Sequence, residues 1–263
     1  MISRLEMYGS WLSSDPAGFV MYFVYFVVAI LFSLILHECA HGWVALQCGD
    51  PTARMLGRLT LDPRKHLDPL GTVFMFLLGF GWAKPVPVNP RNFRNYRRDE
   101  FLVSVAGIVV NFTLFLLCTG LSVLINRLMV GADFYAQFDS GIEGRQMLFI
   151  NLGDMILYGG AALPGDLTAF MAMPWLQYVQ RFLLMMRTIN LSLAVFNLLP
   201  IPPLDGFRLV NNLLRGRLRV TQQVFEVTRV VLLVVCLTGI LGRVLGVVTS
   251  AIDGVVTRAF LML

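Results

Sequence analysis

Charged residues are scarce in this chain, since 21 Lys and Arg and 16 Asp and Glu make up only 14% of its 263 residues, whereas 57% are hydrophobic. The mean hydropathy of +0.71 lies far above that of a water-soluble globular protein. This composition argues against a soluble domain and against a disordered chain. The surplus of five positive charges is spread over several loops without forming one basic face, so we expect orientation in a membrane and no nucleic-acid partner.

Cysteine is scarce as well, with four residues in the chain. Cys39, Cys48, Cys118 and Cys236 lie in or beside apolar segments, and their spacing matches neither a disulfide framework nor a zinc knuckle. We therefore expect reduced cysteines that contribute to packing.

Long apolar runs are abundant. An uncharged helix of about 20 residues rises roughly 30 Å, which matches the hydrocarbon core of a bilayer. The four candidate spans are residues 17–36, 101–126, 188–204 and 230–252. The first two contain no charged residue, whereas Arg243 interrupts the last one. An apolar stretch that begins at Trp175 precedes the third span and is interrupted by Arg181 and Arg187.

Two weaker apolar pieces, residues 69–83 and 147–164, contain several glycines and suit re-entrant or interfacial elements. The sequence thus predicts a mainly α membrane protein with about four transmembrane helices, a re-entrant or hairpin segment near 69–90, and interfacial helices.

We expect a single membrane-embedded domain over residues 1–263, with a core at about 17–210 and a C-terminal helical segment at 220–263. The loop between the second and third spans has about 50 residues, which is too few for an added globular domain of usual size.

The distribution of basic residues predicts the orientation. Loops 49–68, 84–98 and 205–219 contain 13 of the 21 Lys and Arg residues, whereas loops 1–16 and 127–146 contain only three. The positive-inside rule assigns the basic loops to the cytoplasm, and the N-terminus then lies outside. We expect an integral protein of the cytoplasmic membrane.

Residues 37–41 read His-Glu-Cys-Ala-His at the end of the first apolar run. Residues four apart project from one face of a helix, so His37 and His41 can bind one zinc ion, and Glu38 can reach a water beside that ion as a general base. The alternative is a set of polar residues that merely enters the headgroup zone.

Two histidines leave a catalytic zinc site one protein ligand short. Asp205 follows an apolar run with three prolines, at Pro200, Pro202 and Pro203, which cannot continue a regular helix. Irregular backbone at membrane depth often lines a site, but a turn at the membrane surface explains Asp205 equally well.

Taken together, residues 37–41 and 197–206 resemble the motifs of the site-2 proteases, zinc metalloproteases that cut peptide bonds within or near the membrane. The resemblance implies that His37, His41 and Asp205 bind Zn²⁺ and that Glu38 is the catalytic base. It also implies that Asn197 contacts substrate or stabilises the oxyanion.

Residues 81–90 look like the hairpin segment of the same family. Val86 and Val88 alternate there with prolines in a way that suits an extended edge, which can pair with an unwound substrate segment. They are candidate substrate-binding residues, although a plain structural turn explains the pattern as well.

Residues 104–111 resemble the small-residue helix motif of the family, with Gly107 and Asn111 at matching places. The match makes Asn111 a further candidate for substrate binding. The chain departs from the family pattern at Ile108, where proline is expected, and this puts the local helix geometry in question. Because its loops leave no room for a PDZ insertion, the chain resembles the compact branch of the family, which has no PDZ domain.

We therefore predict an intramembrane zinc metalloendopeptidase that cleaves membrane-protein substrates in or near their transmembrane segments, within the lipid bilayer. An alternative of a different class is a membrane transporter or metal-handling protein that binds an ion transiently at His37, His41 and Asp205. Glu38 discriminates the two, because only a peptidase needs it as a base. The remaining histidine, His66, is expected in a loop or interfacial role.

Overall fold

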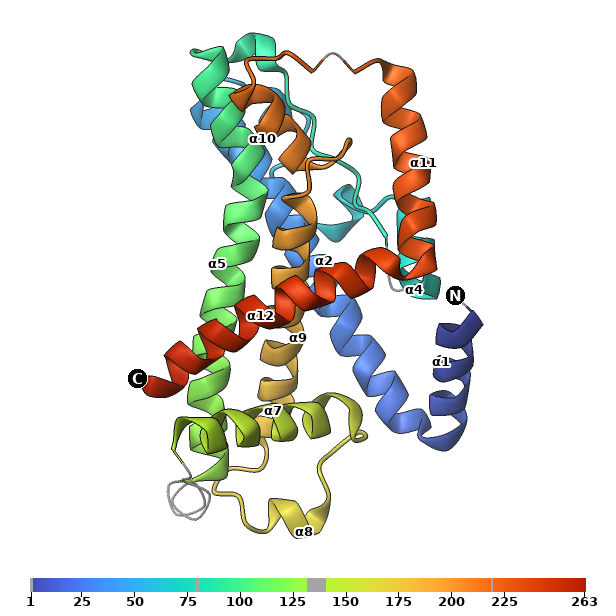
Figure 1. The fold of residues 1–263 in the computed structure, drawn as a ribbon, viewed down its shortest axis with the longest axis vertical. Helices are drawn as coiled ribbons and strands as arrows, with labels where there is room; N and C mark the ends of the chain where they lie inside the picture. Colours follow the sequence, from blue (N-terminus) through green and yellow to red (C-terminus); the bar gives the residue numbers. More distant parts are fainter. Residues whose placement is uncertain (1, 79–80, 132–140, 219) are drawn as a thin grey trace. The chain divides into compact units, whose positions relative to one another are not determined.

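In the computed structural model, helices joined by turns and extended segments make up the chain (Figure 1). The structure describes residues 2–78, 81–131, 141–218 and 220–263, so parts of the predicted re-entrant segment and of the loop 127–146 lie outside the described residues. Those described ranges contain no β-strand, only an isolated antiparallel bridge between Leu67 and Ala83. The mainly α fold class is confirmed.

The helices follow one another in chain order. They are α1 (Ile2–Ser14), α2 (Pro16–Gln47), α3 (Thr52–Met55), the 3-10 turn η1 (Pro63–Lys65), α4 (Pro69–Leu78), the 3-10 turn η2 (Pro90–Asn92), α5 (Tyr96–Val130), α7 (Ile142–Tyr158), α8 (Gly165–Thr168), α9 (Leu176–Asn197), α10 (Asp205–Leu213), α11 (Gln222–Thr238) and α12 (Ile240–Met262).

Among the described residues, 4 helices are long and apolar enough to cross a membrane, namely α2, α5, α9 and α12. The predicted span 17–36 is part of a longer helix, because α2 continues to Gln47. It ends just before Gly49, whose φ of +105° is readily adopted only by glycine. The His-Glu-Cys-Ala-His segment therefore lies inside α2 and not at its end.

The third span differs from the prediction 188–204 at both ends. α9 begins at Leu176 and ends at Asn197, because the prolines from Pro200 onward exclude further helix. The two arginines within it have partners. Arg187 donates to Asp253 and Thr257, and Arg181 donates to the carbonyl oxygen of Gly160 at 2.6 Å.

A fourth spanning helix is confirmed, but its predicted bounds, residues 230–252, are wrong because they cover parts of two helices. Gly239 adopts φ +76° and ends α11, and α12 begins at the next residue and is the spanning candidate (Figure 1). A left-handed glycine changes the direction of the chain without needing any polar residue, so the apolar pattern continues unbroken across the turn.

The two weaker apolar pieces form shorter helices. α4 covers 10 residues and begins beside Asp68, whose carboxylate accepts the N–H of Gly71 at 2.8 Å. α7 covers 17 residues and begins at Ile142, before the predicted start at 147.

Backbone contacts divide the chain into two units, and each of the four long helices contributes residues to both. One unit comprises residues 2–30, 113–191 and 249–263, with an apolar core that includes Met129, Phe149 and Ile156. The other comprises residues 31–112 and 192–248. All of the predicted site residues belong to this second unit.

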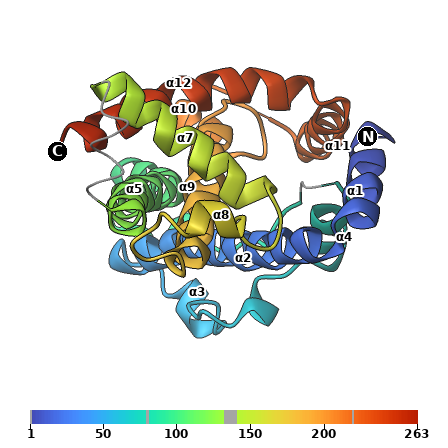
Figure 2. The ribbon, with the colours of Figure 1, turned by 90° about the horizontal axis from the view of Figure 1, so that it is seen from below.

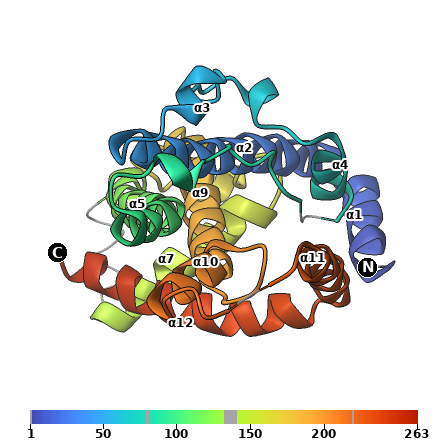
Figure 3. The same ribbon diagram turned by 90° about the horizontal axis from the view of Figure 1, so that it is seen from above.

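Within the second unit, two views at right angles to Figure 1 show α3 and α10 on opposite sides of α2 (Figures 2 and 3). A site that joins α2 to α10 therefore lies on the face of α2 that is turned away from α3.

Candidate metal centre

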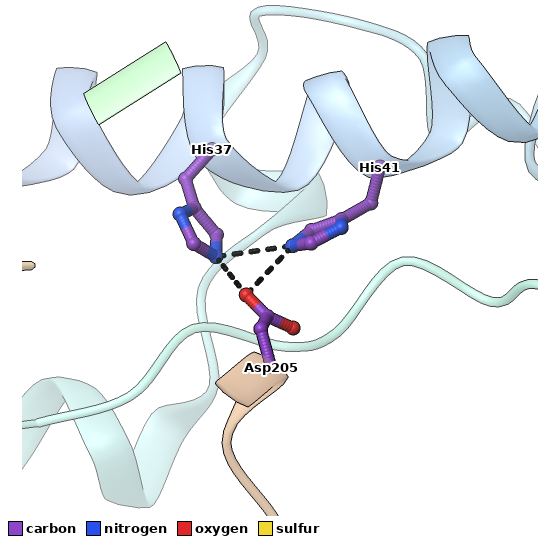
Figure 4. A group of neighbouring side chains, drawn as sticks. All are labelled: His37, His41 and Asp205. Carbon is purple, nitrogen blue, oxygen red and sulfur yellow. Dashed lines mark hydrogen bonds and ion pairs between the residues drawn. The ribbon is translucent and has the colours of Figure 1, made fainter. Parts of the chain in front are cut away.

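His37 and His41 lie one turn apart on α2, and their imidazoles turn toward the same point (Figure 4). Their Nε2 atoms are 3.1 Å apart, and both side chains are buried, with residue exposures of 5% and 8%. The i, i+4 spacing predicted from the sequence thus produces a pair of convergent nitrogen atoms.

Asp205 completes the group from the first turn of α10. Its Oδ2 lies 3.2 Å from Nε2 of His37 and 3.1 Å from Nε2 of His41 (Figure 4). Burial alone would raise the pKa of Asp205, but hydrogen bonds and charge interactions with the two histidines outweigh it and hold the pKa well below its usual range. The carboxylate form, which a metal ligand requires, is therefore favoured.

The residues around Asp205 fix its place. Leu204 is extended, and its N–H donates to the carbonyl oxygen of Ile201, which closes a turn around Pro202 and Pro203. A Cβ on Gly206 would lie 2.3 Å from the carbonyl oxygen of Leu198, so only glycine lets the backbone pass this closely. The Asp-Gly pair thus directs the carboxylate toward α2 from a tightly packed bend.

The three ligand atoms fit a zinc ion. Ligands at about 2.0–2.2 Å from a tetrahedral zinc lie roughly 3.3–3.5 Å from one another, close to the triangle that these side chains form. Oδ2 of Asp205 is buried and faces the two imidazole Nε2 atoms, so a cation held among these three atoms would satisfy all of them. The two nitrogens and one carboxylate oxygen are donors that zinc accepts, and a third protein ligand leaves one position open for water or substrate.

Both imidazoles are oriented by α5. Nδ1 of His41 lies 2.7 Å from the carbonyl oxygen of Val103, which only accepts, so Nδ1 must carry the proton and Nε2 is free to bind a metal. Nδ1 of His37 lies 3.0 Å from Nδ2 of Asn111, and Oδ1 of the same amide is buried without a hydrogen-bond partner. Amide oxygen and nitrogen are assigned from their partners, and exchanging the two brings Oδ1 to Nδ1 of His37, as the metal-binding tautomer of His37 requires.

Gly107 allows this close approach of α5 to α2. A Cβ at this position would lie 2.4 Å from Cε1 and 2.6 Å from both ring nitrogens of His37. Ile108 follows Gly107 at the position where the family pattern has proline. With isoleucine there, α5 is an unbroken helix from Tyr96 to Val130.

Glu38, beside the first ligand, is held by the extended segment that precedes η2. Its Oε2 accepts the backbone N–H of Val86 at 2.8 Å. Val86 was expected at the substrate, but it is only 7% exposed, and its side chain packs against the backbone of Gly42 in α2. In this structure Val86 contacts the predicted base, whereas Val88 is partly buried further along the same segment.

The other predicted residues have different partners. Asn111, expected at the substrate, is 0% exposed and contacts His37 instead. Asn197 ends α9, and its Nδ2 donates to the carbonyl oxygen of Leu193 at 3.0 Å. His66 lies outside the ligand group in a buried loop position, with Nε2 2.8 Å from the carbonyl oxygen of Thr60, as expected of a structural residue.

Comparisons with known proteins agree with this site. The family model "Peptidase family M50" matches residues 25–239. Two relatives are named as candidate zinc metalloproteases. YwhC of Bacillus subtilis (strain 168) is 38% identical over 189 residues, which cover 72% of this chain and 68% of YwhC. Rip2 of Mycobacterium tuberculosis (strain H37Rv) is 29% identical over 207 residues, which cover 75% of this chain and 61% of Rip2.

No solved structure matches the chain. The family match covers most of the sequence and includes both motifs whose side chains converge in the structure. The chain therefore belongs to peptidase family M50, the site-2 protease family of membrane-embedded zinc metalloproteases.

Proposed function

We propose that this protein is an intramembrane endopeptidase that hydrolyses peptide bonds in or near the transmembrane segments of membrane-protein substrates. The observation that carries the proposal is the convergence of His37, His41 and Asp205 within 3.2 Å of one another, with Glu38 next to the first ligand in sequence. The membership of the M50 family supports it.

Zinc bound by these three side chains supplies Lewis-acid polarisation of a substrate carbonyl and lowers the pKa of a neighbouring water. Glu38 then acts as general base, taking a proton from the attacking water and passing it to the leaving amine. The N–H of Val86 holds Oε2 of Glu38 at 2.8 Å and so limits the rotation of the carboxylate. A fixed carboxylate transfers a proton with less reorganisation than a mobile one.

Asn197 is our candidate for stabilising the oxyanion. It lies eight residues before Asp205 in the same motif, at the C-terminal end of α9. To donate to substrate, its Nδ2 must release the carbonyl oxygen of Leu193, to which it now donates. Removal of one such donor typically costs about 3 kcal/mol of transition-state stabilisation.

A substrate helix must unwind locally before its peptide bond can be attacked, and its freed N–H groups then need acceptors. In an extended strand, neighbouring residues point their N–H and C=O groups to opposite sides. The N–H groups of Lys84 and Val86 point toward His66 and Glu38, so the carbonyl groups of Pro85 and Pro87 lie on the other edge. This edge has no N–H donors, and we infer that it accepts hydrogen bonds from substrate, with Val88 beside it.

We infer the orientation from the same loops as before. If α2, α5, α9 and α12 each cross the membrane, segments 48–95 and 198–239 lie on one side and contain the basic clusters. By the positive-inside rule we infer that the metal centre faces the cytoplasm and the N-terminus lies outside.

The test of this function is co-expression of the full chain with tagged single-span membrane proteins. We expect a fragment that the parent produces and the Glu38→Gln variant does not, while the variant retains zinc. Glu226→Gln, at an exposed residue of α11, is the matched control and should cleave like the parent. Unchanged cleavage by Glu38→Gln would refute the role of the base. Zinc transport by the purified protein in vesicles, unaffected by Glu38→Gln and without any proteolysis, would favour the transporter alternative.

A further inference from the structure

Asp50 is a buried carboxylate that lies outside the metal centre. It follows α2 in the turn after Gly49 and is 0% exposed. Among the described residues no salt bridge includes it, and its carboxylate accepts several hydrogen bonds. Burial of a charge without such bonds is strongly unfavourable, so these bonds are needed to keep the carboxylate in place.

The hydrogen bonds of Asp50 join two distant parts of the chain. Thr52 donates locally, through its N–H and its hydroxyl. The other two donors come from the segment before α5, since the N–H of Asn89 reaches Oδ2 and Nδ2 of Asn92 reaches Oδ1, each at 2.7 Å. Asn89 is the residue at which the extended segment 84–88 passes into η2, so Asp50 anchors one end of that segment to the end of α2.

The other end of the segment is anchored separately. The N–H of Lys84 donates to the carbonyl oxygen of His66 at 2.7 Å, and its own carbonyl oxygen accepts from Arg58 at 2.8 Å. Val86 lies between the two anchors and donates to Glu38. Pro85 and Pro87 flank Val86, and their rings fix their own φ angles, so this stretch of backbone is stiff. A shift of the backbone at Asn89 therefore also shifts the N–H of Val86.

We propose that Asp50 is a positioning residue for the reaction, which holds the extended segment 84–89 so that the N–H of Val86 meets the carboxylate of Glu38. The inference rests on the proposed role of Glu38 as the base. Three residues of extended chain, about 10 Å, separate Val86 from Asn89, which is short enough for the anchor to set the position of that one N–H.

The first measurement needs no substrate. Hydrogen exchange in the purified full chain reports on Lys84, Val86, Val88 and Asn89 alone, because the prolines between them have no amide hydrogen. Asp50→Asn should accelerate exchange in this segment and leave the zinc content unchanged. Asp62→Asn is the matched control, since Asp62 caps η1 through the N–H of Arg64 in the same Asx-Pro-Arg pattern as Asn89 caps η2. Unchanged exchange in the Asp50 variant would overturn the proposal.

The second measurement uses the tagged reporter that the parent cleaves, with purified protein in detergent micelles. A shift of about 1 Å in a catalytic group can cost roughly 100-fold, so we expect Asp50→Asn to lower kcat ten- to 100-fold while KM changes little. In the double variant Asp50→Asn with Asn92→Asp, the side-chain amide at position 50 donates to the carboxylate at position 92, and its oxygen still accepts the N–H of Asn89. The N–H of Thr52 loses its acceptor. Recovery of kcat in the double variant supports positioning, and no recovery indicates a local structural role and overturns it.

Asn92→Ala is available if Asp50→Asn does not fold, because Asn92 is exposed and its loss removes one of the two distant bonds. It should lower kcat in the same direction by a smaller factor, and a parental kcat would count against the proposal. Failure of the proposed function is recognised separately, since Glu38→Gln would then retain cleavage. An inactive Glu38→Gln beside a fully active Asp50→Asn would refute the positioning role alone.

Discussion

Gly107 provides the sharpest test of the metal centre, because two physical effects of Gly107→Ala have opposite signs. In a helix interior alanine is favoured over glycine by about 1 kcal/mol, so helix propensity alone predicts a more stable protein. The new Cβ would, however, lie 2.4 Å from Cε1 of His37, whereas ordinary contacts begin near 3.4 Å. The ring or the helix must therefore move by roughly 1 Å, a shift several times the 0.2 Å tolerance of a metal–ligand distance.

We expect Gly107→Ala to lower zinc affinity at least 10- to 100-fold, the range found when residues that orient a metal ligand are replaced. The assay is competition with a chelator of known affinity on the purified full chain, with thermal unfolding measured in parallel. Gly153→Ala is the matched control in α7, where the added Cβ meets Leu184 at an ordinary 3.5 Å and zinc affinity should stay unchanged. Parental zinc affinity in Gly107→Ala would refute the packing of His37 against α5.

Three further predictions concern the ligands and their support. Asp205→Ala should yield protein with far less than one zinc per chain by metal analysis, and full zinc content would remove Asp205 from the ligand set. Asn111→Leu should weaken zinc binding about 10- to 100-fold, because Nδ1 of His37 loses its acceptor, whereas Asn111→Asp keeps an acceptor and should bind at least as well in the same competition assay. Burial tends to raise the pKa of Asp50, but hydrogen bonds from Thr52, Asn89 and Asn92 lower it overall, so its contribution to stability is present above about pH 4 and is lost as the pH falls below its depressed pKa. Unfolding measured between neutral and acidic pH should therefore show the stability gap between parent and Asp50→Asn narrowing below about pH 4, and a constant gap would contradict this linkage.

Local patterns predicted much of the chemistry. Two histidines four residues apart on an apolar helix must share a face, so His37 and His41 were identifiable without any tertiary information. Spans 17–36 and 101–126 were recognisable because about 20 uncharged residues match a bilayer. Where glycine or proline changed the chain direction, the boundaries were wrong, as at Gly239, because an apolar run looks the same on both sides of a turn.

The sequence by itself determined that His37 and His41 can bind one metal ion and that the chain has about four membrane-crossing helices, since both follow from spacing and composition along one element. Asp205, on another element, was identified as a ligand only through the resemblance to the site-2 proteases. The tertiary structure decided the partners. Only folding brings Val86 to Glu38, Asn111 to His37 and Asp50 to Asn89 and Asn92. These contacts join residues 39 to 74 positions apart, and no periodicity along the chain encodes a pairing that depends on how two packed segments meet.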